Sequence, residues 1–153
     1  MDVTVNTELD DPLPTNWIAD LAATAMRAEQ LPESTQLAIT LVSESRMAEL
    51  NSEYLGKLGP TDVLSFPIED FATTPVDAGI DGPPLLLGDI LICPSVVERN
   101  AAVAGVAFDD ELALMVVHGT LHLLGRDHLI DEEAEAMEQR EREILALVGR
   151  ARP

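Results

Sequence analysis

The chain of 153 residues lacks several features of secreted and membrane proteins. Its single cysteine, Cys93, cannot form an internal disulfide bond, which is typical of a reducing compartment. It contains no run of about eighteen apolar residues, which a membrane-spanning helix requires. Its first residues, MDVTVNTELDD, lack the basic stretch and apolar segment of a secretory signal. We therefore expect a cytoplasmic protein with no membrane association.

Positive charge is also scarce, with 9 Lys and Arg residues against 28 Asp and Glu residues and a formal net charge of −19. Because phosphate contacts supply most of the non-specific affinity of nucleic-acid-binding proteins, this composition alone argues against RNA. One interpretation is an acidic surface that keeps the protein soluble. The other is a small cationic cleft on an acidic body. Lys57, Arg99 and Arg126 lie in or near the motifs described below, and a bound divalent metal would add positive charge locally.

The chain has no internal repeat and no linker, and 46% of its residues are hydrophobic, so residues 1–153 are predicted to form one domain. Strands are predicted at 3–7, 36–42, 62–66 and 85–93, the last apolar enough for a buried central strand. Helices are predicted at 16–25, 44–54, 94–105, 111–124 and 131–148, a loop or hairpin excursion at 69–84 and a frayed tail at 150–153. Asp109 or Asp110 is expected to open the fourth helix and Asp131 to cap the fifth. The predicted fold class is α+β, a single domain with a small mixed β-sheet and about five helices.

All the histidines of the chain fall within the run HGTLHLLGRDH, at His118, His122 and His128. His118 and His122 are four residues apart, so on a helix their imidazoles project from one face. Gly125 can adopt a left-handed conformation and end that helix, which lets the chain bring His128 towards the same point. The surrounding residues are apolar nearly all round, which predicts a buried helix with the site at its end. Three converging imidazoles with a vacant position are typical of a catalytic zinc site.

Three alternatives compete with this interpretation. The histidines could be unrelated surface or core residues. The site could be a structural zinc site, although such sites usually have four ligands and are rich in cysteine. Cys93 could provide a fourth ligand, although a buried thiol at a strand end is commonly inert.

The pattern of the three histidines resembles that of the metzincin proteases, which carry a glutamate general base directly after the first histidine. This chain has Gly119 there, and peptide hydrolysis would need another base. The run HGTLHLLGRDH more closely resembles the His-Gly-x-Leu-His-Leu-x-Gly-x-Asp-His signature of the YbeY endoribonucleases. The segments GPTDVLSFP at 59–67 and GDILIC at 88–93 agree with that family in order and spacing.

The resemblance implies a zinc-dependent, single-strand-specific endoribonuclease with one zinc per chain, bound by His118, His122 and His128. It further implies a role in maturation of the 16S ribosomal RNA 3′ end and in ribosome quality control. The expected partners are single-stranded RNA, ribosomal RNA and components of the small ribosomal subunit, with no DNA substrate. The alternatives are a non-catalytic ribosome-assembly factor with a structural metal and a metzincin-like metalloprotease. The attacking group is left open between a metal-activated water and the 2′-hydroxyl of the RNA.

Three further residues are candidates for catalysis. Asp127 belongs to the family motif and could act as a hydrogen-bond acceptor for a ligand, as a general base, or only as a turn residue. Many family members have an arginine after the tyrosine of the Asn-x-x-Tyr-Arg-Gly-Lys run, but this chain has Leu55 in that place. We therefore expect Arg126 or Lys57 to stabilise the charge on phosphate, although lysine lacks the bidentate fork of arginine.

Overall fold

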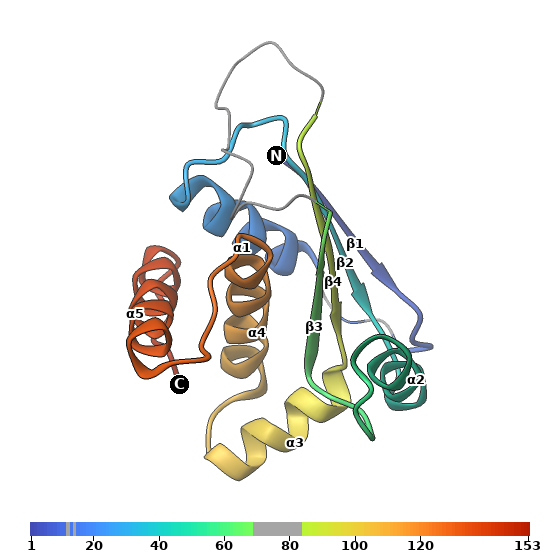
Figure 1. Ribbon diagram of the computed structural model, residues 1–153. Coiled ribbons are helices and arrows are strands. Elements are labelled where there is room, and N and C mark those ends of the chain that lie inside the picture. Colours follow the sequence, from blue (N-terminus) through green and yellow to red (C-terminus); the bar gives the residue numbers. More distant parts are fainter. Residues whose placement is uncertain (12, 14, 69–83) are drawn as a thin grey trace.

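The structure is a computed structural model that describes residues 1–11, 13, 15–68 and 84–153 (Figure 1). The strands in these ranges are β1 (Asp2–Thr7), β2 (Gln36–Leu41), β3 (Val63–Pro67) and β4 (Leu86–Ile92). The helices are α1 (Asn16–Ala28), α2 (Glu44–Leu55), α3 (Pro94–Ala104), α4 (Phe108–Leu123) and α5 (Asp131–Leu147). The predicted α+β class with a small mixed sheet and five helices is confirmed. The loop predicted at 69–84 lies outside the described residues, apart from Pro84.

The four strands form one mixed sheet in the order β1-β2-β4-β3. β1, β2 and β4 are parallel, and β3 runs antiparallel to β4 at the edge. β4 lies between two strands, as its apolar sequence predicts. The β2–β4 register shifts next to Gly88, which has a φ of +150°. A Cβ atom there would lie 2.4 Å from the carbonyl oxygen of Phe66, so only glycine lets β3 pair this closely.

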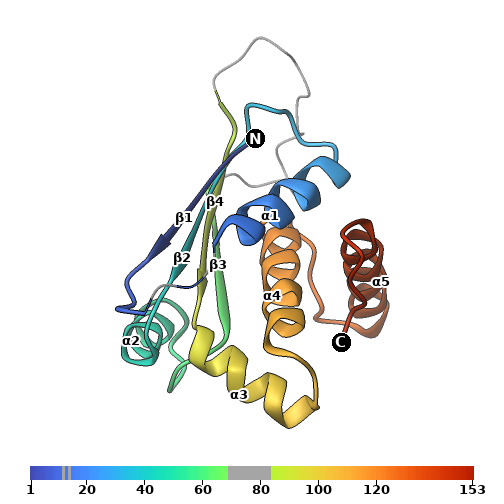
Figure 2. The same cartoon turned by 180° about the vertical axis from the view of Figure 1, so that it is seen from behind.

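Helices cover the two faces of the sheet unequally (Figures 1 and 2). α1 and α4 pack on one face, and α5 packs against α1 and α4. This side holds the larger core cluster, which includes Ile39, Ile90 and Ile92 from the strands. α2 contributes Met47 and Leu50 to a smaller cluster with Leu64 of β3. The mixed sheet therefore has an apolar core on each side, and α4 lies in the larger one.

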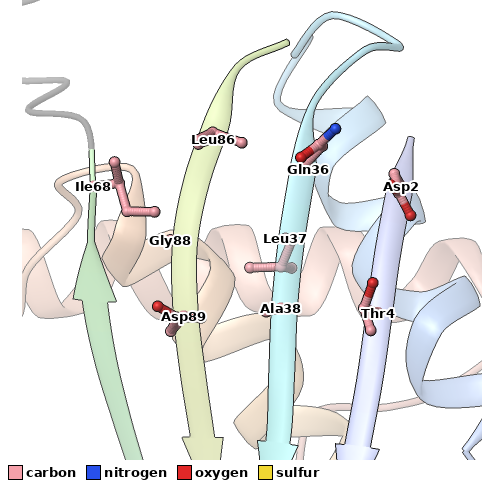
Figure 3. A pocket seen from close by; sticks show the side chains of 9 residues that line it. All are labelled: Asp2, Thr4, Gln36, Leu37, Ala38, Ile68, Leu86, Gly88 and Asp89. Atoms are coloured by element: carbon pink, nitrogen blue, oxygen red, sulfur yellow. The ribbon is translucent and has the colours of Figure 1, made fainter.

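Part of the sheet surface on the side of α2 is hollowed. The hollow has a volume of about 150 Å³. Figure 3 shows its lining residues on β1, β2 and β4, among them Thr4, Gln36 and Asp89. Ile90 faces α4, so the preceding Asp89 points to the opposite face, because successive side chains of a strand alternate. Asp89 therefore does not belong to the side of the sheet on which α4 packs.

The helix ends differ in detail from the prediction. α4 begins at Phe108 with Ala107 as its N-cap, and α5 begins at Asp131 with Ile130 as its N-cap, so the predicted aspartate caps are wrong. Asp109, Asp110 and Asp131 lie inside the first turns instead, where acidic side chains interact favourably with the helix dipole.

The predicted frayed tail is also wrong. Arg150 forms an ion pair with Asp110 at 2.8 Å and lies 5.1 Å from the centre of the Trp17 ring. Arg152 forms an ion pair with Glu141 at 3.4 Å. These contacts hold residues 150–152 against α1, α4 and α5. Among the described residues, no helix is both long and apolar enough to cross a membrane.

Candidate metal centre

α4 is the rigid element that carries the first two histidines. Ten of its residues are buried, as the sequence predicts for this helix. Gly119 lies against the sheet, where a Cβ atom would be 3.0 Å from Cγ2 of Ile90 and 3.3 Å from Oγ of Ser65. The Ser65 hydroxyl donates a hydrogen bond to the Gly119 carbonyl at 3.1 Å. Glycine therefore lets α4 approach β3 and β4 closely, and a side chain at this position would require Ile90 and Ser65 to shift.

The turn after α4 places the second histidine. Gly125 has a φ of +88°, as predicted for the residue that ends this helix. The amide of Gly125 donates to the His122 carbonyl and that of Arg126 to the Leu121 carbonyl, which is the Schellman pattern. In this turn the Arg126 carbonyl lies 3.0 Å from Nδ1 of His122. A carbonyl oxygen only accepts, so Nδ1 carries the proton and Nε2 keeps its lone pair for a metal.

The structure brings the three imidazoles together. The ring centroids of His118 and His122 are 6.1 Å apart, those of His118 and His128 are 5.5 Å apart, and those of His122 and His128 are 6.0 Å apart. Three imidazole nitrogens bound tetrahedrally to zinc at about 2.0–2.1 Å hold their ring centroids roughly 5 Å apart. The observed separations are slightly longer, and His118 stands outside the described group whose possible ligand atoms all lie within 4.8 Å of one another. The imidazoles of His122 and His128, with a carboxylate beside them, are donors that suit a divalent transition metal.

Asp127 lies in the same cluster. Potential ligand atoms of His122, Asp127 and His128 all lie within 4.8 Å of one another. Oδ1 of Asp127 accepts a hydrogen bond from the backbone amide of His128 at 2.7 Å, which fixes the carboxylate beside the third histidine. The His128 side chain is 55% exposed, so the cluster is open to solvent on this side. The three-histidine ligand set stays a prediction, to which the structure adds a carboxylate next to two of the rings.

The two predicted cations occupy different environments. Nε of Arg126 donates to Oε1 of Glu29 at 3.0 Å, so this guanidinium is tied to the residue that follows α1. Lys57 follows α2 and is exposed, and its ammonium forms no ion pair with any of the described residues. Cys93 lies in the smaller core cluster with Met47, away from the histidines in the chain and buried on the side of α2.

The arginines of the chain lie beside carboxylates. Each of the eight arginines has an acidic partner. These pairs are Arg27–Glu33, Arg46–Glu8, Arg99–Glu44, Arg126–Glu29, Arg140–Glu143, Arg142–Glu138, Arg150–Asp110 and Arg152–Glu141. A hydrogen bond from Arg140 lowers the pKa of Glu143. At the start of α4, burial raises the pKa of Glu111, and the nearby carboxylate of Asp62 raises it further.

One residue of the centre was missed by sequence reasoning. Glu141 of α5 is buried, and its Oε2 lies 3.1 Å from Nδ1 of His118. The sequence held a signal for it, because Met137, Glu141 and Ile144 share one helical face and both of its neighbours there are apolar. An acidic residue on a buried face requires a partner, and that partner is the first histidine.

A mixed sheet that supports a buried helix with a solvent-open histidine cluster at its end defines a small α+β protein with a candidate metal centre. A family model described as Endoribonuclease YbeY matches residues 3–149, and the chain belongs to this family. The resemblance inferred from the three motifs is thus confirmed.

Similar proteins support this assignment. The chain is 41% identical over 130 residues to Endoribonuclease YbeY of Frankia casuarinae, a match that covers 84% of this chain and 65% of that protein. It is 37% identical over 134 residues to Endoribonuclease YbeY of Bacillus cytotoxicus, covering 88% of this chain and 86% of that one. The solution structure of TM1509 from Thermotoga maritima has a TM-score of 0.60 and 26% identity, with 95% of this chain and 91% of that chain covered.

Proposed function

We propose that this protein is a zinc-dependent endoribonuclease that cleaves single-stranded RNA in the cytoplasm. Its role would be maturation of the 16S ribosomal RNA 3′ end and ribosome quality control, in contact with small-subunit components. The observation that carries the proposal is the cluster of three imidazoles, with ring centroids 5.5–6.1 Å apart, open to solvent at His128 and with the Asp127 carboxylate beside two of the rings. The relatives described as Endoribonuclease YbeY support RNA as the substrate.

The residues of the centre have separable roles in this proposal. His118, His122 and His128 hold one zinc ion, which would supply Lewis-acid chemistry at a phosphodiester. The Arg126 carbonyl orients His122, and the exposure of His128 leaves an approach for the RNA chain. The Asp127 carboxylate, next to two of the rings, is placed to accept a proton from the attacking hydroxyl group.

The charge on phosphate requires a cation, and two candidates are proposed. Lys57 is exposed and can meet a phosphate without first leaving a carboxylate among the described residues. Arg126 is closer in sequence to the histidines, but its guanidinium must share its hydrogen bonds with Glu29. We therefore favour Lys57 for binding the RNA backbone and assign Arg126 to holding the turn, with any phosphate contact made by its remaining donors.

Two other functions are separated from this one by the same experiment. A structural metal in a non-catalytic assembly factor would bind at the histidines without any cleavage. A metzincin-like protease carries its glutamate base at the position of Gly119, where a side chain would crowd Ile90, so peptide hydrolysis would need a base elsewhere.

The test is a comparison of substrates with the full chain at known zinc content. Single-stranded RNA, duplex RNA, single-stranded DNA and casein are incubated with the wild type, His122→Ala and the matched surface variant Glu135→Gln. We expect one zinc per chain and cleavage of single-stranded RNA only, both lost in His122→Ala and retained in Glu135→Gln. Zinc bound without RNA cleavage would favour the assembly factor, and casein cleavage would favour the protease. Full zinc occupancy in folded His122→Ala would refute the ligand assignment.

A further inference from the structure

A buried carboxylate lies behind the metal centre on a different helix. Glu141 is 1% exposed and shares the inner face of α5 with Met137, Ile144 and Leu145, all of which are core residues. Removing a carboxylate from water is unfavourable unless charged or hydrogen-bonding partners replace the solvent. Glu141 therefore requires partners for both of its oxygens.

Each oxygen of Glu141 has one partner. Oε2 lies 3.1 Å from Nδ1 of His118, and Oε1 lies 3.4 Å from Nε of Arg152. The arginine can only donate, so the carboxylate accepts from it. Arg152 also forms an ion pair with Glu138 at 3.9 Å, and Arg150, two residues earlier, pairs with Asp110 at 2.8 Å. The Glu141 carboxylate thus lies between Arg152 and His118 of α4 and contacts both.

We propose that Glu141 is a positioning residue for the metal centre. Its carboxylate accepts a hydrogen bond from the Nδ1–H group of His118. This bond fixes the tautomer and the orientation of the ring and leaves Nε2 free to bind the metal. Its negative charge also makes the imidazole a more basic ligand and favours a cation at the cluster. The inference rests on the proposed metal site but not on the cleavage of RNA.

The centre would then have two kinds of support. His122 is oriented by the neutral carbonyl of Arg126, which lies four residues away in the same turn. His118 is oriented by a charged group 23 residues further along the chain. Because the second contact joins α4 to α5, the position of α5 becomes part of what sets the metal affinity.

The test measures zinc affinity by competition with a chromogenic chelator, on full chains whose fold is checked without metal. Glu141→Leu removes both the acceptor and the charge, and we expect it to weaken zinc binding about 10–100-fold. Glu141→Gln keeps an acceptor, and we expect a smaller loss of about tenfold or less. Glu135→Gln, an exposed residue on the same helix, removes the same charge and should bind zinc as the wild type does. If Glu141→Leu does not fold, Glu141→Gln carries the comparison.

A second measurement does not depend on bound metal. Because the chain has three histidines in all, ¹⁵N spectra of the histidine-labelled protein resolve the tautomer of each ring. We expect the metal-free wild type to hold His118 in the Nδ1–H form, and Glu141→Gln or Glu141→Leu to shift it to a mixture while His122 stays unchanged. Zinc affinities equal to that of Glu135→Gln, or an unchanged His118 tautomer in a folded Glu141→Leu chain, would overturn the proposal. A wild type that binds no zinc would refute the proposed function, while the tautomer measurement would still decide the role of Glu141.

Discussion

Replacing Gly125, which ends α4, should affect both the stability of the chain and its zinc affinity, and the two effects can be measured separately. In Gly125→Ala the new Cβ meets no atom within 4 Å, so the effect comes from the φ of +88°. A left-handed conformation costs a residue with a side chain roughly 1–2 kcal/mol. The lower entropy of the unfolded chain offsets about 0.4–1 kcal/mol of this. We expect a net loss of about 1 kcal/mol, which for a chain of this size lowers Tm by about 2–4 °C.

Gly105 supplies a matched control at the end of α3. It has a φ of +71°, open space around its Cβ position and the same two turn hydrogen bonds as Gly125. Gly105→Ala should therefore lose similar stability. Only Gly125→Ala moves the Arg126 carbonyl that orients His122, so only this variant should weaken zinc binding, by about tenfold.

The assay combines thermal unfolding of the metal-free chains with a zinc titration. Gly125→Asn should recover most of the stability and the zinc affinity, because asparagine tolerates the left-handed conformation. The reasoning fails if Gly125→Ala and Gly105→Ala bind zinc equally well, or if Gly125→Ala is as stable as the wild type.

Three other predictions concern charge. Leu55→Arg should raise the cleavage rate of single-stranded RNA up to about tenfold, measured as turnover, by restoring a cation at the family's position; unchanged turnover in a folded variant would mean that another residue fills the role. Glu111→Gln should raise Tm at pH 7, because the raised pKa of Glu111 means that its ionised form opposes folding. The gain should vanish below the ordinary glutamate pKa of 4.5, where the carboxyl is neutral in both states, and a constant gain across pH would contradict this assignment. RNA affinity measured from low to moderate salt should fall less steeply than for a basic nuclease, since the net charge of −19 repels RNA at long range; a steep loss would show that a few clustered cations dominate.

Local patterns carried most of the fold and the core of the site. The period of the apolar residues placed the described helices and strands, and β4 was recognised as interior from its apolar run. The histidine cluster was predictable because His118, His122 and Gly125 act within one helix and one turn. The residue at which a helix begins was less predictable. Asp131, for example, is the first residue of α5 rather than its N-cap.

Contacts between distant segments were not visible in the sequence. Glu141 stands among many acidic residues of α5, and its pairing with His118 depends on how α5 packs against α4. The partner of Arg126 is Glu29, 97 residues away, so the sequence could not show that this guanidinium is already engaged. Helix packing decides both of these pairings, and a single sequence holds no direct record of it.

The pairing of all eight arginines with carboxylates changes what binding to a polyanion means for this protein. On a basic protein, phosphate adds to free guanidinium groups and displaces only mobile ions. Here a phosphate that approaches an arginine must compete with a carboxylate of the same chain for the guanidinium donors, and the nearby acid repels it. We therefore expect the arginines to contribute less to binding a polyanion than the same number of unpaired arginines would. Under the proposed function, this leaves Lys57 and the metal as the main points of attraction for RNA.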